Sequence, residues 1–328
     1  MSVPRYGLIA FLSFGVAFDQ TSFATEREAD VITIVEADGD LVVRRGDALI
    51  AVHVADSGGK PILDRLRSPS GLRLTRDHPM RPGRADESTD HPHHRGLWLT
   101  HGEVNGIDFW TEDPAAHGDL RDGDIIETSR RVDGDEVTTD NVWRGPDGDV
   151  LREHRTLRYS VDDGRTVIDW TSRLTAGETP VRFGDTKEGT LGVRVAGTMK
   201  VDAGRGGTSV NAAGDRDGDA WGEASPWCDY SGPTADESDN RDGVAGITIH
   251  SHPSNVDHPP RWHTRTYGLF AANPFGVHHF TGGARTDGVG LPPGETLTLR
   301  YRIVLHDGGL DVDRARRDQR RFEGTGTD

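Results

Sequence analysis

Residues 150–174 read VLREHRTLRYSVDDGRTVIDWTSRL, and this stretch decides the kind of fold that the chain adopts. Two segments, 150–160 and 165–174, are rich in β-branched and aromatic residues, and Asp162-Asp163-Gly164 between them is a tight Asp-Gly turn. Polar and apolar residues alternate over 153–159, which leaves one face of that segment polar. The stretch therefore predicts two antiparallel strands joined by a short hairpin.

The same texture extends along the chain on both sides of this hairpin. Residues 310–322 form the one convincing helix, with arginines toward its C-terminal end, and 203–240 is expected to be a long excursion over one rim. We therefore expect an all-β protein, a large antiparallel β-sandwich that forms a single domain over 30–310, followed by a short C-terminal helix and tail at 311–328. The further strands are expected at 31–35, 41–44, 49–54, 61–66, 71–74, 97–101, 125–126, 136–143 and 295–305.

The composition excludes several classes of partner. The chain has 328 residues and a formal net charge of -16, so neither a nucleic acid nor an anionic membrane is expected to bind it. No segment of the sequence is apolar and long enough to insert across a bilayer. Cys228 is the only cysteine, which excludes an intramolecular disulfide and a cysteine-based zinc site, and we expect it to be a small semi-buried residue beside Trp227.

The first 24 residues carry a weak secretory pattern. Arg5 supplies a modest positive charge, 6–18 is an apolar run, and Ser22-Phe23-Ala24 is a small-x-small cleavage pattern. The alternative is a disordered N-terminal extension. The protein is expected to be exported if 1–24 is a signal peptide, and cytoplasmic otherwise.

The chemistry gathers in residues 90–110, which read DHPHHRGLWLTHGEVNGIDFW. Pro92 stiffens the chain, so His93 and His94 are expected on a loop and not in a helix. Residues 97–101 alternate as a short strand that places Leu97, Leu99 and His101 on one face and Trp98 on the other. We interpret this density of histidines, acids and tryptophans as part of an active or binding site.

Six short motifs identify a family. They are HPHHRGL at 91–97, HGEVNG at 101–106, KEG at 187–189, HPSN at 252–255, WH at 262–263 and NPFG at 273–276. With these motifs the chain resembles a bacterial and archaeal family of unknown function, DUF6807, which is also labelled PmoA-like or methane oxygenase PmoA. The resemblance implies a β-supersandwich of the galactose-mutarotase type, an architecture that commonly handles carbohydrates. We do not expect a methane oxygenase, because a membrane-bound copper oxygenase subunit needs several long apolar spans.

The first hypothesis is therefore an enzyme that acts on a carbohydrate, either a small sugar or an oligosaccharide. Mutarotases of similar fold pair a histidine acid with a glutamate base on opposite sides of one carbon. The resemblance implies an acid among His93, His94, His101 and His263, and a base in Glu188 or Glu103. A hydrolase with two carboxylates, Glu188 with Glu103 or Asp108, is the other form of this hypothesis. The expected substrate-binding residues are Arg95, Trp98, Asn105, Trp110, Lys187, His252, Trp262, Asn273 and His279.

Two further hypotheses stay open. A divalent metal could be held by His93, His94, His101, His252, His263 or His279 with Glu103 or Glu188, in a metal-dependent hydrolase or oxygenase, although no compact zinc motif is present. The protein could also be a non-catalytic carbohydrate-binding module, in which single glycines and tryptophans serve only turns and packing. A site is favoured because separate histidine-bearing segments near 93, 101, 252 and 263 are hard to explain by packing alone.

Overall fold

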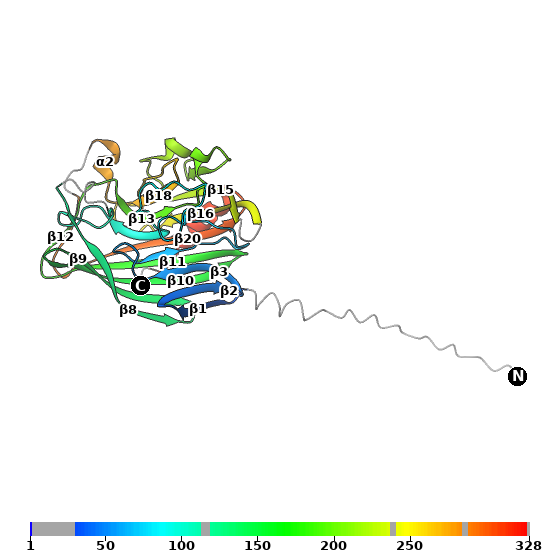
Figure 1. Cartoon of the computed structure of the whole chain (residues 1–328), viewed down its shortest axis with the longest axis horizontal. Helices are drawn as coiled ribbons and strands as arrows, with labels where there is room; N and C mark the ends of the chain where they lie inside the picture. The colour runs from blue at the N-terminus through cyan, green and yellow to red at the C-terminus, as the bar shows by residue number, and fades with distance from the viewer. Residues whose placement is uncertain (2–29, 113–118, 237–240, 284–287, 327–328) are drawn as a thin grey trace.

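The computed structural model describes Met1 and residues 30–112, 119–236, 241–283 and 288–326. Two large antiparallel sheets make up most of the molecule, each with eight strands (Figure 1). The first sheet has the order β1 (Ile32–Ala37), β2 (Asp40–Arg45), β3 (Ala48–Val54), β4 (Ile62–Asp64), β5 (Leu97–His101), β13 (Gly189–Arg194), β18 (Leu269–Asn273) and β17 (Arg261–Trp262).

The second sheet contains the hairpin predicted from 150–174. Its order is β14 (Thr208–Asn211), β15 (Trp227–Asp236), β16 (Arg241–Ser251), β20 (Thr296–Asp307), β11 (Arg165–Ala176), β10 (Gly148–Asp162), β9 (Glu136–Gly145) and β8 (Asp124–Asp133). Two small pairs, β12 (Val181–Phe183) with β19 (Val289–Leu291) and β6 (Ile107–Asp108) with β7 (Arg121–Asp122), complete the strands. The other elements of the described ranges are two short 3-10 turns, Val201–Ala203 and Asp217–Ala220, and the helices α2 (Val277–Thr281) and α3 (Val312–Glu323).

One apolar core lies between the two sheets. It joins residues of β5, β13 and β18 to residues of β10, β11 and β20, as the burial of Leu99, Val193 and Phe270 beside Leu157 and Ile303 shows. In β10 and β11 the register pairs Leu157 with Trp170 and Asp162 with Arg165 across the Asp-Gly turn. The predicted all-β antiparallel sandwich with a short C-terminal helix is confirmed.

The strand that leads out of the histidine segment has the predicted bounds. β5 spans Leu97–His101, and all five of its residues are buried. Leu97 and Leu99 belong to the core between the sheets, whereas Trp98 packs on the other face with Trp110 and Ile62. The alternation in the sequence therefore identified both faces of this strand.

The expectation for 203–240 is wrong in part. That stretch supplies β14 and β15, and β15 pairs with β16 over ten residue pairs from Trp227↔His250 to Asp236↔Arg241. The sequence of β15 does not alternate between polar and apolar residues, because some of its buried residues are polar. Asp229, for example, is buried and accepts hydrogen bonds from Thr248 and His306 on neighbouring strands. Cys228 is fully buried in the core, not semi-buried.

The two helices begin with different kinds of cap. In α3, predicted at 310–322, Asp311 accepts a hydrogen bond from the Arg314 amide (3.0 Å), and Ala315 and Phe322 are buried. Sequence analysis did not predict α2, because its cap comes from far along the chain: Asp185 accepts from the amides of His278 and His279 (2.7 and 3.1 Å). Among the described helices none is long and apolar enough to cross a membrane. The proposed signal segment lies outside the described residues.

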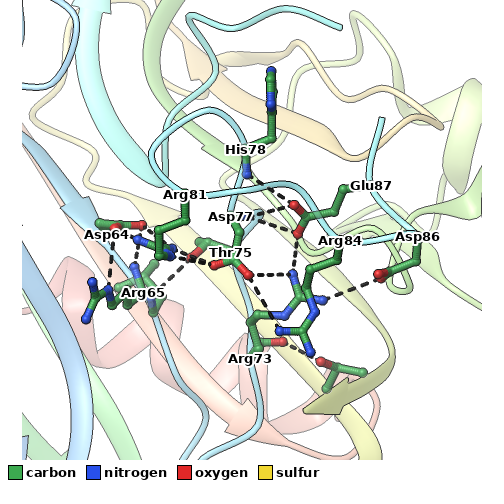
Figure 2. A network of polar contacts seen from close by, with 12 residues as sticks. Asp64, Arg65, Arg73, Thr75, Asp77, His78, Arg81, Arg84, Asp86 and Glu87 are labelled. Carbon is green, nitrogen blue, oxygen red and sulfur yellow. Dashed lines mark hydrogen bonds and ion pairs between the residues drawn. The ribbon is translucent and has the colours of Figure 1, made fainter. Parts of the chain in front are cut away.

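The loop before the histidine segment is held by a polar network, which Figure 2 shows. Glu87 is fully buried, accepts hydrogen bonds from the amides of Asp77 and His78 (2.9 and 3.1 Å) and pairs with Arg73. Arg81 pairs with Asp77 (2.6 Å) and with Asp64 on β4, which ties the loop to the first sheet. The histidine segment therefore starts from an anchored position.

Candidate functional site

A cavity of about 390 Å³ lies among the connections of the first sheet. Four segments far apart in sequence reach it: the loop before β5, the turn after β6, the loop before β13 and the β17–β18 connection. A larger surface hollow around Ser70 and Asp307, about 690 Å³, contains none of the predicted site residues. The smaller cavity is lined by His91, His93, His94, Asp108, Trp110, Thr111, Lys187, Glu188, His263, Arg265 and Tyr267.

Glu188 and His263 face each other in this cavity. His263 Nδ1 lies 3.9 Å from Glu188 Oε2, and Lys187 Nζ lies 2.5 Å from Glu188 Oε1. Burial alone would raise the pKa of Glu188, but the electrostatic interactions with His263 and Lys187 and the hydrogen bond from Lys187 outweigh burial, and the pKa is lowered. Glu188 is therefore a carboxylate at neutral pH, poised to accept a proton.

The proton on His263 is placed by Arg265. Arg265 Nε donates to His263 Nε2 (3.0 Å), and an arginine can only donate, so the neutral ring carries its proton on Nδ1. Burial lowers the pKa of His263 to about 4, with Glu188 opposing the effect, so the ring is neutral at pH 7. The Nδ1–H group is buried, and no hydrogen-bond partner for it lies in the described part of the chain.

An arginine also fixes the proton position on His94, from the side of the ring that faces away from the cavity. Arg194 Nη1 donates to His94 Nδ1 (3.1 Å), and the other nitrogen of Arg194 binds Ser88 Oγ and Asp90 Oδ1 (3.1 and 2.8 Å). Burial lowers the pKa of His94 well below its usual value. The ring is therefore neutral with its proton on Nε2, which is buried and has no partner among the described residues.

His93 completes the histidine wall. Its ring lies 4.4 Å from that of His94 at 80°, and burial, helped by the nearby Lys60 and His91, lowers its pKa to about 4. Lys60 is itself buried and bonds to Glu112 (2.7 Å), which also pairs with Arg95 through two hydrogen bonds (2.8 and 2.6 Å). Arg95, predicted to bind substrate, is thus occupied by Glu112 and does not line the cavity.

Aromatic rings form another part of the wall. His91 stacks on His94 (4.8 Å) and on Tyr267 (5.1 Å) at interplanar angles of 6° and 12°, and it adopts a positive φ of 45°. The indole Nε1 of Trp110 is buried with no partner in the described ranges. The cavity therefore combines flat apolar surfaces with ring nitrogens that can bond to a ligand.

Several predicted residues lie under the cavity or beside it instead of on its wall. His101 is fully buried, donates from Nε2 to the Gly184 carbonyl (2.7 Å) and packs on Phe275. A Cβ at Gly189 would lie 2.4 Å from His101 Nδ1, which explains the glycine of the KEG motif. Asn273 accepts from the amides of Phe275 and Gly276 and donates to the Thr186 carbonyl, so it positions the segment that carries Glu188.

The remaining predicted residues lie outside the cavity wall, and their contacts stabilise the fold. Glu103 pairs with Arg182 (2.6 Å), and Asn105 has a positive φ and bonds to the backbone at 180 and 182. Trp98 and Trp262 are fully buried and do not line the cavity.

Two predicted histidines lie off the wall as well. His252 packs against Phe322 of α3 and bonds to Ser254, and it is absent from the cavity wall. His279, on α2, is exposed; its pKa is lowered by partial burial and then by Lys187, so it lies near the cavity without lining it.

The side chains of the metal hypothesis are not gathered into one ligand set. Among the described residues, no group of three or more His, Cys, Asp or Glu side chains is arranged to hold a metal ion. His101 and His252 in particular have other partners. The geometry of this part of the chain therefore does not support the predicted histidine and carboxylate metal shell.

Sequence analysis missed Arg265, Tyr267 and His91 as parts of the wall, and Arg194 behind it. Arg265 and Tyr267 follow the WH motif within five residues, so their proximity to His263 was the available signal. Arg194 lies in β13 and had no signal at all, because its role comes only from the pairing of β13 with β5.

The fold and the cavity define an all-β sandwich protein with a site lined by histidines and a glutamate. The chain belongs to the family of unknown function DUF6807, whose model matches residues 35–319. No curated protein matches the chain.

Solved structures with a similar course of the chain include enzymes of carbohydrate metabolism. A protein described as an aldose 1-epimerase, from Klebsiella pneumoniae subsp. pneumoniae, is 12% identical with a TM-score of 0.36, and the match covers 87% of this chain and 81% of that one. A polysaccharide lyase is 12% identical with a TM-score of 0.35 (88% and 34% covered), and a 4-alpha-glucanotransferase from Thermococcus litoralis is 11% identical with a TM-score of 0.32 (84% and 39%). The chain thus spans about a third of the lyase and two fifths of the transferase.

Proposed function

We propose that this protein is an enzyme that performs acid–base chemistry on a carbohydrate or a related polyhydroxylated substrate. The observation that carries this proposal is the pair of Glu188 and His263 in the cavity, 3.9 Å apart between Oε2 and Nδ1. One member accepts a proton and the other presents an N–H group. In a bound sugar, the base and the donor could contact the hydroxyl oxygen and the ring oxygen of one carbon.

The pKa values assign the roles. Glu188, as a carboxylate, takes the proton of a substrate hydroxyl. His263, whose pKa is about 4, holds no imidazolium proton at pH 7, so it acts as a neutral donor that stabilises charge on an oxygen. In an epimerase reaction at an anomeric carbon, Glu188 would take the proton of the anomeric hydroxyl, and that oxygen would form a carbonyl as the ring C–O bond breaks. The electron pair of that bond would go to the ring oxygen, which the His263 N–H group would stabilise until the proton held on Glu188 is returned to it.

The other polar groups of the wall support a substrate with several hydroxyls. Ring nitrogens of four lining residues, His93, His94, Trp110 and His263, are buried and have no partner within the described residues. Buried polar atoms are costly unless they bond to something, and hydroxyls can accept from such donors. The ring of Tyr267, which is only partly buried and lines the cavity, offers an apolar surface on which a sugar can rest.

A hydrolase with two carboxylates is the second form of this proposal. Asp108 lines the cavity with Glu188, whereas Glu103 is paired with Arg182 outside it. Asp108 Oδ1 accepts from the amides of Trp110 and Thr111 (2.7 and 3.1 Å), which holds the carboxylate in place. If hydrolysis occurs, Asp108 is therefore the partner of Glu188 that we propose.

The test is the variant Glu188→Gln beside the matched control Glu103→Gln. Both enzymes would be assayed for interconversion of sugar anomers and for release of reducing ends from oligosaccharides. We expect Glu188→Gln to lower turnover by about 10²- to 10⁴-fold with an unchanged unfolding midpoint, because it removes only the base. Glu103→Gln should keep its turnover. Full activity in Glu188→Gln, or equal losses in both variants, would contradict the proposal.

A further inference from the structure

Arg265 differs from Lys187, which also lines the cavity, and from the arginines behind its wall. Lys187 pairs with Glu188 (2.5 Å), Arg95 with Glu112 (2.6 Å) and Arg194 with Asp90 (2.8 Å). Arg265 lines the cavity, but its contacts in the described part of the chain include no carboxylate; its side-chain hydrogen bond goes to the neutral ring of His263. An arginine without a counter-charge on the wall of a cavity is a site that favours an anion.

The side chain of Arg265 is also held in place. Its guanidinium carbon lies 5.1 Å from the centre of the Trp221 ring, and Nε is bound to His263 Nε2 at 3.0 Å. The backbone is fixed as well, since its amide donates to the Leu269 carbonyl (2.7 Å) and its carbonyl accepts from Gly268 (3.0 Å). These contacts use one face and the Nε edge of the guanidinium, which leaves Nη1 and Nη2 for a ligand.

The geometry of two free Nη atoms suits one kind of ligand. A carboxylate or a phosphate accepts two parallel N–H hydrogen bonds from a guanidinium, whereas a sugar hydroxyl takes one. The neighbouring histidines are neutral, so they add hydrogen-bond donors without adding charge. The protein carries a formal net charge of -16, so an anion would be drawn to this position by Arg265 and not by the surface as a whole.

We propose that the substrate carries an anionic group, the carboxylate of a sugar acid or the phosphate of a sugar phosphate, which binds to Nη1 and Nη2 of Arg265. This inference rests on the proposed function, because it names the class of sugar that the same cavity takes. Arg265 then has two tasks: it binds the anion and it keeps the proton of His263 on Nδ1. The anion and the reacting oxygen would lie on either side of the His263 ring.

The test compares three probes by isothermal titration calorimetry: D-glucose, D-glucuronate and D-glucose 6-phosphate. We expect at least one anionic probe to bind 10-fold or more tightly than glucose, and the identity of that probe separates a carboxylate from a phosphate. Arg265→Gln should abolish this preference, and Arg265→Lys should retain part of it. Arg302→Gln is the matched control, because Arg302 also stacks on a ring, that of Phe322, but pairs with Asp169 on the side of α3.

Two outcomes would overturn the inference: glucose binding as tightly as both anions, or no binding by any of the three probes. If glucose is converted and Glu188→Gln abolishes conversion, the proposed function stands while the inference falls. Arg265-dependent binding of an anion without any conversion would support the inference and contradict the proposed enzyme. If Arg265→Gln fails to fold, the salt dependence of binding to the wild-type protein tests the inference instead. Added salt should weaken the binding of the anionic probes and leave the binding of glucose unchanged.

Discussion

Two regions of this protein hold buried histidines with opposite kinds of partner. At the cavity, arginines donate to the rings: Arg194 to His94 and Arg265 to His263. On the face of the second sheet that α3 covers, acceptors hold the rings: Asp229 binds His306 Nε2 (2.8 Å), and Gln319 binds His250 Nδ1 (3.0 Å). The arginine donors require neutral rings at His94 and His263, whereas the carboxylate of Asp229 favours the protonated ring of His306.

This difference separates histidines that fasten the fold from histidines that can act. The pKa of His306 is raised, because the attraction of Asp229 overcomes burial, whereas burial lowers the pKa of His263 to about 4. An acceptor uses the N–H group of a ring, while an arginine uses the lone pair and leaves the N–H group for a ligand. Histidine density in a sequence does not make this distinction, but the type of partner does.

The largest expected effect is on stability, and it tests the arginine that bonds to His94. Arg194→Met would remove the donor to the buried His94 Nδ1 and one of the two arginines that pair with Asp90, the other being Arg76, and we expect a loss of about 3 kcal/mol in the free energy of unfolding. Urea denaturation at pH 7 measures it. The control Arg302→Met removes a more exposed pair and should cost about 1 kcal/mol or less. Equal losses in the two variants would show that Arg194 has no special role.

The second prediction concerns pH. The folded pKa of His263 is about 4, and its unfolded value is about 6.5. Below pH 6.5 the unfolded chain therefore binds a proton that the folded protein refuses, so stability is full above pH 6.5 and falls as the pH drops toward 4. This loss is about 3 kcal/mol for one histidine. Replacing His263 by Gln should flatten the curve of unfolding free energy against pH in that window by a comparable amount. A curve parallel to that of the wild type would contradict it.

The third prediction concerns His306, where stability should depend on pH with the opposite sign. Because the folded pKa of His306 is raised, its contribution to stability is full below the unfolded pKa and is lost as the pH rises through the folded pKa. Asp229→Asn removes the attraction, and we expect a loss of about 2 kcal/mol at pH 6 and a smaller one at pH 9. Thermal unfolding at the two pH values measures this. A loss that grows with pH would refute the assignment.

The smallest effect sharpens the role of Glu188. Lys187→Met removes the ammonium that lies 2.5 Å from Glu188, so the pKa of Glu188 should rise. Lys187 is one-third exposed, and water screens its charge, so the acidic limb of the pH–rate profile should move upward by less than about one pH unit. Arg182→Met, at the Glu103 pair outside the cavity, should leave that limb unmoved.

Local patterns predicted the strands well where the chain makes tight hairpins. The β10–β11 pair follows from alternation and an Asp-Gly turn, both of which act within a few residues. β15 was missed because buried polar residues interrupt its apolar pattern, and the partners of one of them, Asp229, lie on β16 and β20. α2 was missed because its cap, Asp185, is more than 90 residues away. Local sequence patterns therefore fail to predict an element when its polar groups hydrogen-bond to residues far away in the chain.

The candidate site divides in the same way. His93, His94, Glu188, His263, Lys187 and Trp110 were named from motifs, and the structure brings these six to one cavity. His101, Asn273 and Trp98 carry motif positions too, but they pack beneath the wall, and His252 lies with α3. A motif marks a residue that the fold cannot easily change, and tight packing produces that constraint as readily as chemistry does.

The sequence by itself determined the antiparallel β class, the C-terminal helix and the segments that carry the chemistry, because strand alternation, Asp-Gly turns and helix capping act between near neighbours. Only the tertiary structure decided which histidines share a cavity and which nitrogen of each carries the proton. Arg194 reaches His94, which lies 100 residues away in the chain, only after β13 pairs with β5. Arg265 lies two residues from His263, but this pair faces Glu188 only because the β17–β18 connection lies beside the loop before β13. Hydrogen-bond partners far apart in the chain are chosen by the packing of the sheet, which no local pattern records.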